Sequence, residues 1–217
     1  MRYTHNRFCN NTDEFIFNGA GHWDIPIIQP EPYEPIDFVG FNYAKTISKQ
    51  NTCKANGVHF FIDDYQFERV WNEWKKYGQF LNQFRAVFTP DFSLYTDWPK
   101  ALQLFSHYKK HFIGAYLQRL GVKVYPTIGW SDESSYDWCF DGEPVKATVA
   151  VSSVGTQKNQ QAKKAFLMGY DAMLEGLEPR VILFHGNVPK EARGNIIKIE
   201  TFQEKQFRKL DKEVITS

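Results

Sequence analysis

The chain has 217 residues, of which 42% are hydrophobic and 24% are charged, a composition typical of a soluble globular protein with a hydrophobic core. Its 26 basic and 25 acidic residues give a net charge of +1, which argues against a strongly basic nucleic-acid-binding protein but leaves a local basic patch open. The length fits a single domain, and (β/α) barrels commonly have about 200–250 residues.

Aromatic residues are unusually frequent, at 17% of the chain. We interpret most of them as core residues, because buried rings contribute large apolar areas. The alternative is that some of them line a groove in which sugars or bases stack.

The cysteines and the N-terminus predict neither a disulfide framework nor export. Cys9, Cys53 and Cys139 form no C-x-x-C pair, so their spacing supports neither disulfides nor a zinc site. The first residues contain no apolar signal core, and the chain has no run of 18 apolar residues. The cytoplasm is therefore the expected location.

The chain begins with an expected N-terminal extension and entry loop over residues 1–35, which contains the proline-rich segment 25–35. A single α/β domain is expected over residues 36–217. Seven apolar segments rich in β-forming residues follow, and they are continuous, as is typical of strands covered on both faces. These segments are residues 37–43, 58–64, 85–92, 122–130, 147–153, 180–186 and 196–201. Residues 25–28 are a candidate for an eighth strand.

Helices are predicted between several of these strands, over residues 66–84, 98–120 and 159–177. The apolar residues of the first helix are spaced three and four places apart, which predicts one buried face. Gly78 lies inside this helix and is a candidate for dividing it in two. The buried face consists of Phe67, Val70, Trp71, Trp74, Tyr77, Leu81 and Phe84.

The alternation of strands and helices implies parallel strands joined by right-handed crossovers. The chain has no G-x-G-x-x-G after the first strand and no G-x-x-x-x-G-K-[ST], the usual nucleotide-binding motifs of open sheets. We therefore predict a small or irregular (β/α) barrel-like fold with a mostly parallel sheet, in preference to an open doubly wound sheet.

Three stretches of the sequence together resemble the uncharacterised domain family numbered 4417. They are GVHFFIDDYQFERVWN (57–72), FTPDFSLYTDWPKALQL (88–104) and GVKVYPTIGWSDESSYDWCFDG (121–142). The resemblance covers roughly residues 35–190 and implies one domain in a phage or mobile-element setting. Because the family has no assigned activity, the resemblance supplies no catalytic residues.

Polar residues follow the predicted strands at their carboxyl ends, which face a common mouth in a parallel α/β barrel. This convergence is the strongest functional indication in the sequence. The residues are Asn42, Asp63, Asp64, Asp91, Ser93, Trp130, Ser131, Asp132, Ser152, Ser153, His185, Asn187 and Glu200.

Asp63 and Asp64 are expected to have different roles. Successive side chains of an extended segment point to opposite faces, so only one of the two can easily face the mouth. We expect Asp64 to cap the following helix and Asp63 to face the mouth. The alternative is that both residues only mark the start of the helix.

Asp91 has no helix to cap, although an Asx-turn is an alternative structural role. Together with Asp63 it is predicted to act as general acid and base, or to hold a divalent cation through oxygen ligands. His185 is the predicted proton-transfer partner, and the alternative is a hydrogen-bonded structural histidine.

Further strand-end residues are predicted to bind substrate, with Trp130 as a stacking wall. A phosphate could be held by the segment VAVSSVGT (149–156), which places two hydroxyl groups and a glycine after a strand. The predicted substrate-binding set is Asn42, Ser93, Trp130, Asp132, Ser152, Ser153 and Asn187.

His107 and His111 lie four residues apart on a predicted helix, which is the spacing of metal ligands. No third ligand stands near them in the sequence, and Lys109 and Lys110 between them indicate an outer, solvated helix face.

The sequence thus predicts an enzyme that acts by hydrolase-like acid/base chemistry on a polar nucleotide, sugar or sugar-phosphate. The alternative is a non-catalytic binding module that engages nucleic acid or a host protein through an aromatic surface. Metal dependence and oligomeric state stay open.

Overall fold

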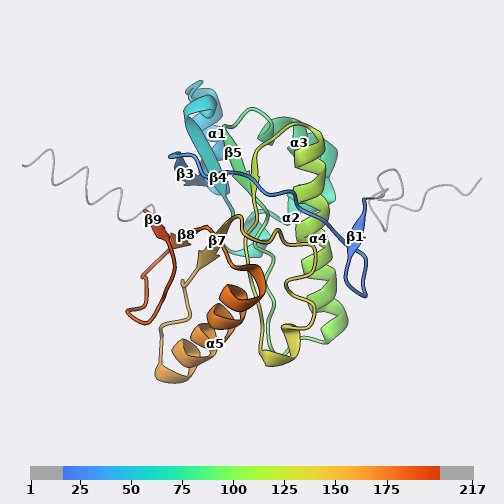
Figure 1. Cartoon of the computed structure of the whole chain (residues 1–217). Helices are drawn as coiled ribbons and strands as arrows, with labels where there is room; N and C mark the ends of the chain where they lie inside the picture. The colour runs from blue at the N-terminus through green and yellow to red at the C-terminus, as the bar shows by residue number, and fades with distance from the viewer. Residues whose placement is uncertain (1–16, 201–217) are drawn as a thin grey trace, which may run out of the picture.

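The computed structural model describes residues 17–200, which fold into parallel β-strands surrounded by helices (Figure 1). One sheet has four parallel strands in chain order: β3 (Asp37–Gly40), β4 (Asn56–His59), β5 (Ala86–Phe88) and β6 (Val124–Tyr125). The second has three: β7 (Thr148–Ser152), β8 (Val181–His185) and β9 (Ile196–Ile199). A parallel bridge between Thr127 and Ala150 joins the two sheets. The predicted parallel α/β architecture is confirmed.

The two sheets follow one another around a common interior, but they do not form a closed barrel. Between residues 17 and 200 no hydrogen-bonded pairing joins β9 to β3. Residues of both strands instead line a cavity of about 500 Å³ that separates these two edges.

Side chains from successive strands meet in this interior because alternate residues of a strand point to the same face. The buried cluster contains Phe38, Ala86, Phe88, Tyr125, Ala150, Leu183 and Ile199. The intervening residues, such as Val87 and Ile182, face outward and are covered by helices. Both faces of the strands are therefore buried, which explains their continuous apolar sequences.

Five α-helices lie in the described part of the chain. They are α1 (Phe41–Lys49), α2 (Glu68–Asn72), α3 (Trp74–Leu81), α4 (Lys100–Arg119) and α5 (Gln160–Leu177). Short 3₁₀ turns occur at η3 (Cys53–Ala55), η4 (Asp64–Gln66) and η5 (Glu133–Ser135). Helices α3 and α4 lie on the side of the first sheet, and α5 lies beside the second (Figure 1). Helix α1 was not predicted, because its first residues continue the apolar run of β3.

The helix predicted over residues 66–84 does divide, but at Glu73 and not at Gly78. Glu73 has a non-helical backbone between α2 and α3, with φ −128° and ψ 45°. Gly78 stays helical and lets α3 approach α4, because a β-carbon there would lie 2.4 Å from the Tyr116 ring. The glycine thus serves helix packing and does not break the helix.

The predicted buried face of this region is confirmed. Phe67, Trp71 and Trp74 are at most 5% exposed. The Trp74 ring packs edge-on against Tyr116 and Phe112 of α4, at centroid distances of 4.6 and 5.4 Å. These rings are core residues and not an external binding surface.

The N-terminal segment is built into the domain. Strands β1 (Gly19–Ala20) and β2 (Ile25–Pro26) pair antiparallel. Ile25 and Ile28 are buried, and the Ile28 amide donates to the Gly142 carbonyl over 2.8 Å. The entry loop expected over residues 25–35 therefore packs on the domain from its first residues.

Cys53 and Cys139 are free and buried, and Cys9 lies outside the described residues. None of the helices between residues 17 and 200 has the length and apolarity needed to cross a membrane.

Candidate functional site

A cavity of about 480 Å³ opens beyond the carboxyl ends of β5 and β7, and we call it the strand-end cavity. It is lined by residues 91–96, residues 128–131, Ser152 at the end of β7, two residues of the β7–α5 loop and three residues of α5. This is the edge at which parallel α/β proteins build their sites. Four of the ten predicted site residues line it: Asp91, Ser93, Trp130 and Ser152.

Asp91 lies in the wall of this cavity, just after β5 and the buried residues Thr89 and Pro90. Burial raises the pKa of Asp91 to about 7, since the attraction of Lys110 only partly opposes it and the repulsion of Asp64 adds to it. A carboxyl group that titrates near neutral pH can both donate and accept a proton.

The carboxylate next to Asp91 is Asp64, and not Asp63 as predicted. Asp63 and Asp91 do follow neighbouring parallel strands at the same end, but Asp63 is exposed and does not line the cavity. The expected capping role of Asp64 is wrong, because its carboxylate accepts from the Ser93 amide at 3.0 Å and the Ser93 hydroxyl at 2.9 Å. The η4 turn follows Asp63 without any side-chain cap.

Trp130 forms an aromatic wall of the strand-end cavity. Its ring packs on Phe166 of α5 with centroids 5.4 Å apart. Gly169 makes room for the indole, because a β-carbon there would lie 2.1 Å from the Trp130 Nε1 atom. The position fits the predicted stacking role.

His185 lies behind the cavity and does not line it. Its Nδ1 atom is 3.3 Å from the Ser152 hydroxyl, which does line the cavity. The buried imidazole stacks on Phe61 and lies 4.9 Å from the His59 ring, centroid to centroid. The contact with Ser152 links His185 to the cavity.

The other predicted substrate-binding residues do not line the cavity, and three of them hold local structure. Asp132 caps η5 by accepting from the amide and the hydroxyl of Ser134 at 2.9 and 2.6 Å. The buried Ser153 hydroxyl donates to the Asn187 carbonyl at 2.7 Å, which joins the loops after β7 and β8. Asn42 is exposed in the first turn of α1.

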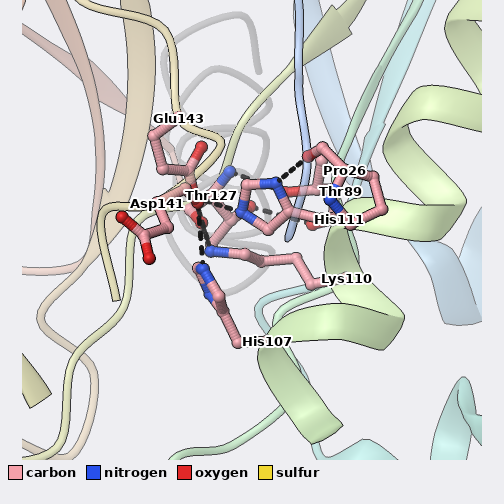
Figure 2. Close-up of polar contacts among 8 residues, drawn as sticks. All are labelled: Pro26, Thr89, His107, Lys110, His111, Thr127, Asp141 and Glu143. Atoms are coloured by element: carbon pink, nitrogen blue, oxygen red, sulfur yellow. Dashed lines mark hydrogen bonds and ion pairs between the residues drawn. The ribbon is translucent and has the colours of Figure 1, made fainter. Parts of the chain in front are cut away.

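A second group of polar residues, which we call the buried cluster, consists of His107, Lys110, His111 and Glu143. The first three project from α4 toward Glu143, as Figure 2 shows. The prediction of a solvated face at His107 and His111 was wrong: both rings are buried, and so are Lys109 and Lys110. Glu143 is the third potential ligand that the local sequence lacked.

Lys110 and His111 favour the ionised form of Glu143. The Lys110 ammonium donates to Glu143 Oε1 at 2.6 Å, and His111 Nε2 lies 3.0 Å from the same oxygen. Burial raises the pKa of Glu143, but the charges and hydrogen bonds of Lys110 and His111 outweigh it and hold that pKa below its usual range. Burial, with Lys110 and His111 adding to it, holds the pKa of His107 well below its usual range.

The available sequence signal for this cluster was the His107–His111 spacing. Glu143 lies 32 residues beyond His111, so only the packing of α4 on the loop after η5 brings the carboxylate to the histidines. The lysines were misleading because Lys109 and Lys110 pair inward, with Glu68 and Glu143.

The comparison with protein families matches residues 17–203 to the domain of unknown function DUF4417. The match covers the whole described part of the chain. The chain belongs to this family. The three stretches that resemble the family contain Asp64, Asp91 and Trp130 of the cavity region. His107 lies just beyond the second of these stretches, residues 88–104.

Two proteins of mycobacterial phages are similar to the chain. It is 34% identical over 173 residues to the Gene 1 protein of Mycobacterium phage L5. The aligned region covers 79% of this chain and 75% of that protein. It is also 33% identical over 172 residues to the Gene 1 protein of Mycobacterium phage D29. This aligned region covers 79% of this chain and 63% of that protein. No solved structure matches. The phage setting implied by the resemblance is confirmed.

Proposed function

We propose that this protein is a hydrolase-like enzyme that binds a polar nucleotide, sugar or sugar-phosphate in the strand-end cavity. The observation that carries the proposal is the convergence of Asp91, Ser93, Trp130 and Ser152, from three successive strand ends, on one cavity. A concave site with a few polar groups among apolar walls is the usual form of a small-molecule site. We also propose that strands β3 to β9 form an incomplete barrel around the mouth of the strand-end cavity.

In this proposal Asp91 is the general acid and base, because it combines access to the cavity with a pKa of about 7. Asp64 and Ser93 set its electrostatic surroundings. His185 acts through Ser152, whose hydroxyl it contacts at 3.3 Å. Should a divalent cation bind in the cavity, Asp91 and Asp64 are the carboxylates that the fold offers, since Asp63 is exposed.

The β7–α5 loop favours a substrate with a phosphate group. Gly155, with φ +80°, and Thr156 line the cavity between Ser152 and the start of α5. Ala162 of the first turn of this 18-residue helix also lines it. Backbone N–H groups and the helix dipole at such a position favour an anion.

The test is a thermal-shift screen of nucleoside mono- and triphosphates and hexose phosphates, followed by mass spectrometry of the products. A ligand should raise the melting temperature and be hydrolysed. Asp91→Asn should keep binding and lose turnover by roughly 10²–10⁴-fold, the usual contribution of a general acid or base. Asp63→Asn is the matched control and should behave like the wild type. Full turnover by Asp91→Asn, or no binding across the panel, would refute the proposal.

The alternative, a non-catalytic binding module, is favoured by exposed aromatic residues near the cavity. Tyr65, Tyr95 and Trp98 are 80%, 54% and 37% exposed, and Tyr95 also lines the cavity. Exposed rings can stack on unpaired bases. Fluorescence anisotropy with a labelled single-stranded oligonucleotide tests this function: binding lost in Tyr95→Ala, without turnover of any small phosphate ester, would support the module.

A further inference from the structure

Each imidazole of the buried cluster gives one ring N–H to a backbone carbonyl. His107 Nε2 lies 3.1 Å from the Asp141 carbonyl oxygen, and His111 Nδ1 lies 2.7 Å from that of Pro26 (Figure 2). Because a carbonyl oxygen only accepts, these contacts place the hydrogens on His107 Nε2 and His111 Nδ1. Of the remaining nitrogens, His107 Nδ1 has no hydrogen-bond partner among the described residues, and His111 Nε2 faces Glu143 Oε1 at 3.0 Å. A metal ion bound between these residues takes the place of the proton on His111 Nε2. Metal-binding histidines are characteristically oriented in this way.

Two atoms of the cluster are buried without a hydrogen-bond partner in the described part of the chain: His107 Nδ1 and Glu143 Oε2. Both side chains are buried, and a buried polar atom without a hydrogen bond costs free energy of folding. Each unpartnered lone pair therefore requires an explanation. Both of these atoms carry lone pairs. One bound cation can accept the lone pairs of both atoms, whereas an N–H group can donate to only one of them.

The spacing of the ligand atoms fits a single ion after a small adjustment. His107, His111 and Glu143 each offer a ligand atom, and these atoms all lie within 4.8 Å of one another. His111 Nε2 and Glu143 Oε1 are 3.0 Å apart. Two ligands bound tetrahedrally at about 2.0–2.2 Å from zinc lie roughly 3.3–3.6 Å apart.

We propose that His107, His111 and Glu143 bind a divalent transition-metal ion of the zinc class. Two imidazoles and one carboxylate are a ligand set that suits zinc and other borderline metals. All three side chains are buried, so the ion is structural and does not meet a substrate. It ties α4 to the loop after η5 and, through the His111–Pro26 contact, to β2. The proposal is independent of the function of the strand-end cavity.

Lys110 is the competitor that the metal ion must displace. Its ammonium donates to Glu143 Oε1 at 2.6 Å and to the Thr127 carbonyl at 2.9 Å, so it now supplies the positive charge at this carboxylate. Its charge also acts on Asp91, which gives the displaced side chain a second carboxyl group to approach. Removing the ammonium should therefore strengthen metal binding.

The experiment is a titration of the full-length, chelator-treated protein with Co²⁺, followed by competition with Zn²⁺. The proposal predicts one visible Co²⁺ absorption band that saturates at one ion per chain, is abolished by zinc, and is accompanied by a higher melting temperature. His107→Ala should weaken binding at least tenfold. His22→Ala, which removes an exposed histidine, is the matched control and should bind like the wild type.

Lys110→Met separates a metal site from a hydrogen-bonded network of the same residues. It should bind Co²⁺ about tenfold more tightly than the wild type and keep the same absorption band. If neither the wild type nor Lys110→Met shows a saturable band or a zinc-dependent melting temperature, the cluster is an ion-pair network and the proposal is overturned. Should circular dichroism show that His107→Ala does not fold, His107→Gln takes its place with the same expected loss.

Discussion

The strand-end cavity and the buried cluster each place a carboxyl group within reach of the charge of Lys110, yet the two groups titrate in opposite directions. Burial raises the pKa of both Asp91 and Glu143. Glu143 receives a direct hydrogen bond from Lys110 and contacts His111, and these interactions lower its pKa below the usual range. The charge of Lys110 attracts Asp91 without a direct hydrogen bond and only partly opposes the effect of burial, while Asp64 repels it. The pKa of Asp91 therefore rises to about 7.

The difference shows that burial alone does not decide the charge of a carboxyl group. For Glu143 the charges of Lys110 and His111, together with their hydrogen bonds, decide it, because they stabilise the ionised form where water is excluded. The cavity therefore holds a carboxyl group suited to proton transfer, and the cluster holds a carboxyl group whose lowered pKa suits it to binding a cation. Accessibility agrees with this division, since the cavity is open and the cluster is closed.

The largest effect is expected for Glu143→Gln, measured in metal-free buffer that contains a chelator. The substitution leaves Lys110 and His111 buried without their anion, and breaking a buried pair from one side costs about 3–5 kcal/mol. Urea unfolding followed by fluorescence measures the loss. Glu191→Gln, in an exposed pair with Lys163, is the control and should leave the midpoint unchanged. An equally small effect of both substitutions would contradict the role assigned to the cluster.

Asp91→Asn should change the pH dependence of stability in the direction set by a raised pKa. Unfolded Asp has a pKa of 3.8 and folded Asp91 of about 7, so the wild type loses stability as pH rises between about 4 and 7. Above pH 7 the variant should be the more stable protein, by at most about 4 kcal/mol, and the advantage should shrink toward pH 4. Denaturant midpoints at pH 5, 6, 7 and 8 measure it. A difference that stays constant with pH would show that Asp91 titrates normally.

A smaller effect is expected for Ser93→Ala, which removes the hydroxyl group that donates to Asp64 beside the strand-end cavity. The Asp64 carboxylate loses the hydroxyl bond at 2.9 Å but keeps the amide bond at 3.0 Å. We expect a loss of roughly 1–2 kcal/mol at pH 7, because hydrogen bonds to charged groups are stronger than neutral ones. Thermal unfolding measures it against Ser48→Ala, which removes a longer, neutral hydrogen bond to the Gln83 side chain at 3.3 Å. Equal melting temperatures for the two variants would show that the Asp64–Ser93 contact does not stabilise the fold.

The smallest effect is expected for Asp132→Ala, which removes the cap of η5. A lost side-chain cap costs about 0.5–1 kcal/mol at an exposed position. Ligand binding in the strand-end cavity should be unchanged, because Asp132 does not line it. A parallel measurement of melting temperature and ligand affinity checks both parts. Reduced affinity at unchanged stability would return Asp132 to the substrate-binding residues.

The sequence by itself determined the parallel α/β class, the buried face of α2 and α3, and the edge of the sheet at which polar residues gather. These features depend on local periodicity and on strand direction, which neighbouring residues encode. Asp91, Ser93, Trp130 and Ser152 could be found in this way because each lies at, or within five residues beyond, the carboxyl end of a strand that opens to the cavity.

Only the tertiary structure decided which side chains meet. Asp64 replaces Asp63 beside Asp91 because Ser93, 29 residues away, binds its carboxylate. Glu143 completes the buried cluster because the loop after η5 packs on α4. Lys109 and Lys110, which by composition belong on a solvated face, turn inward to carboxylates from distant segments. Such pairings follow from the packing of remote elements, so local patterns in the chain carry no record of them.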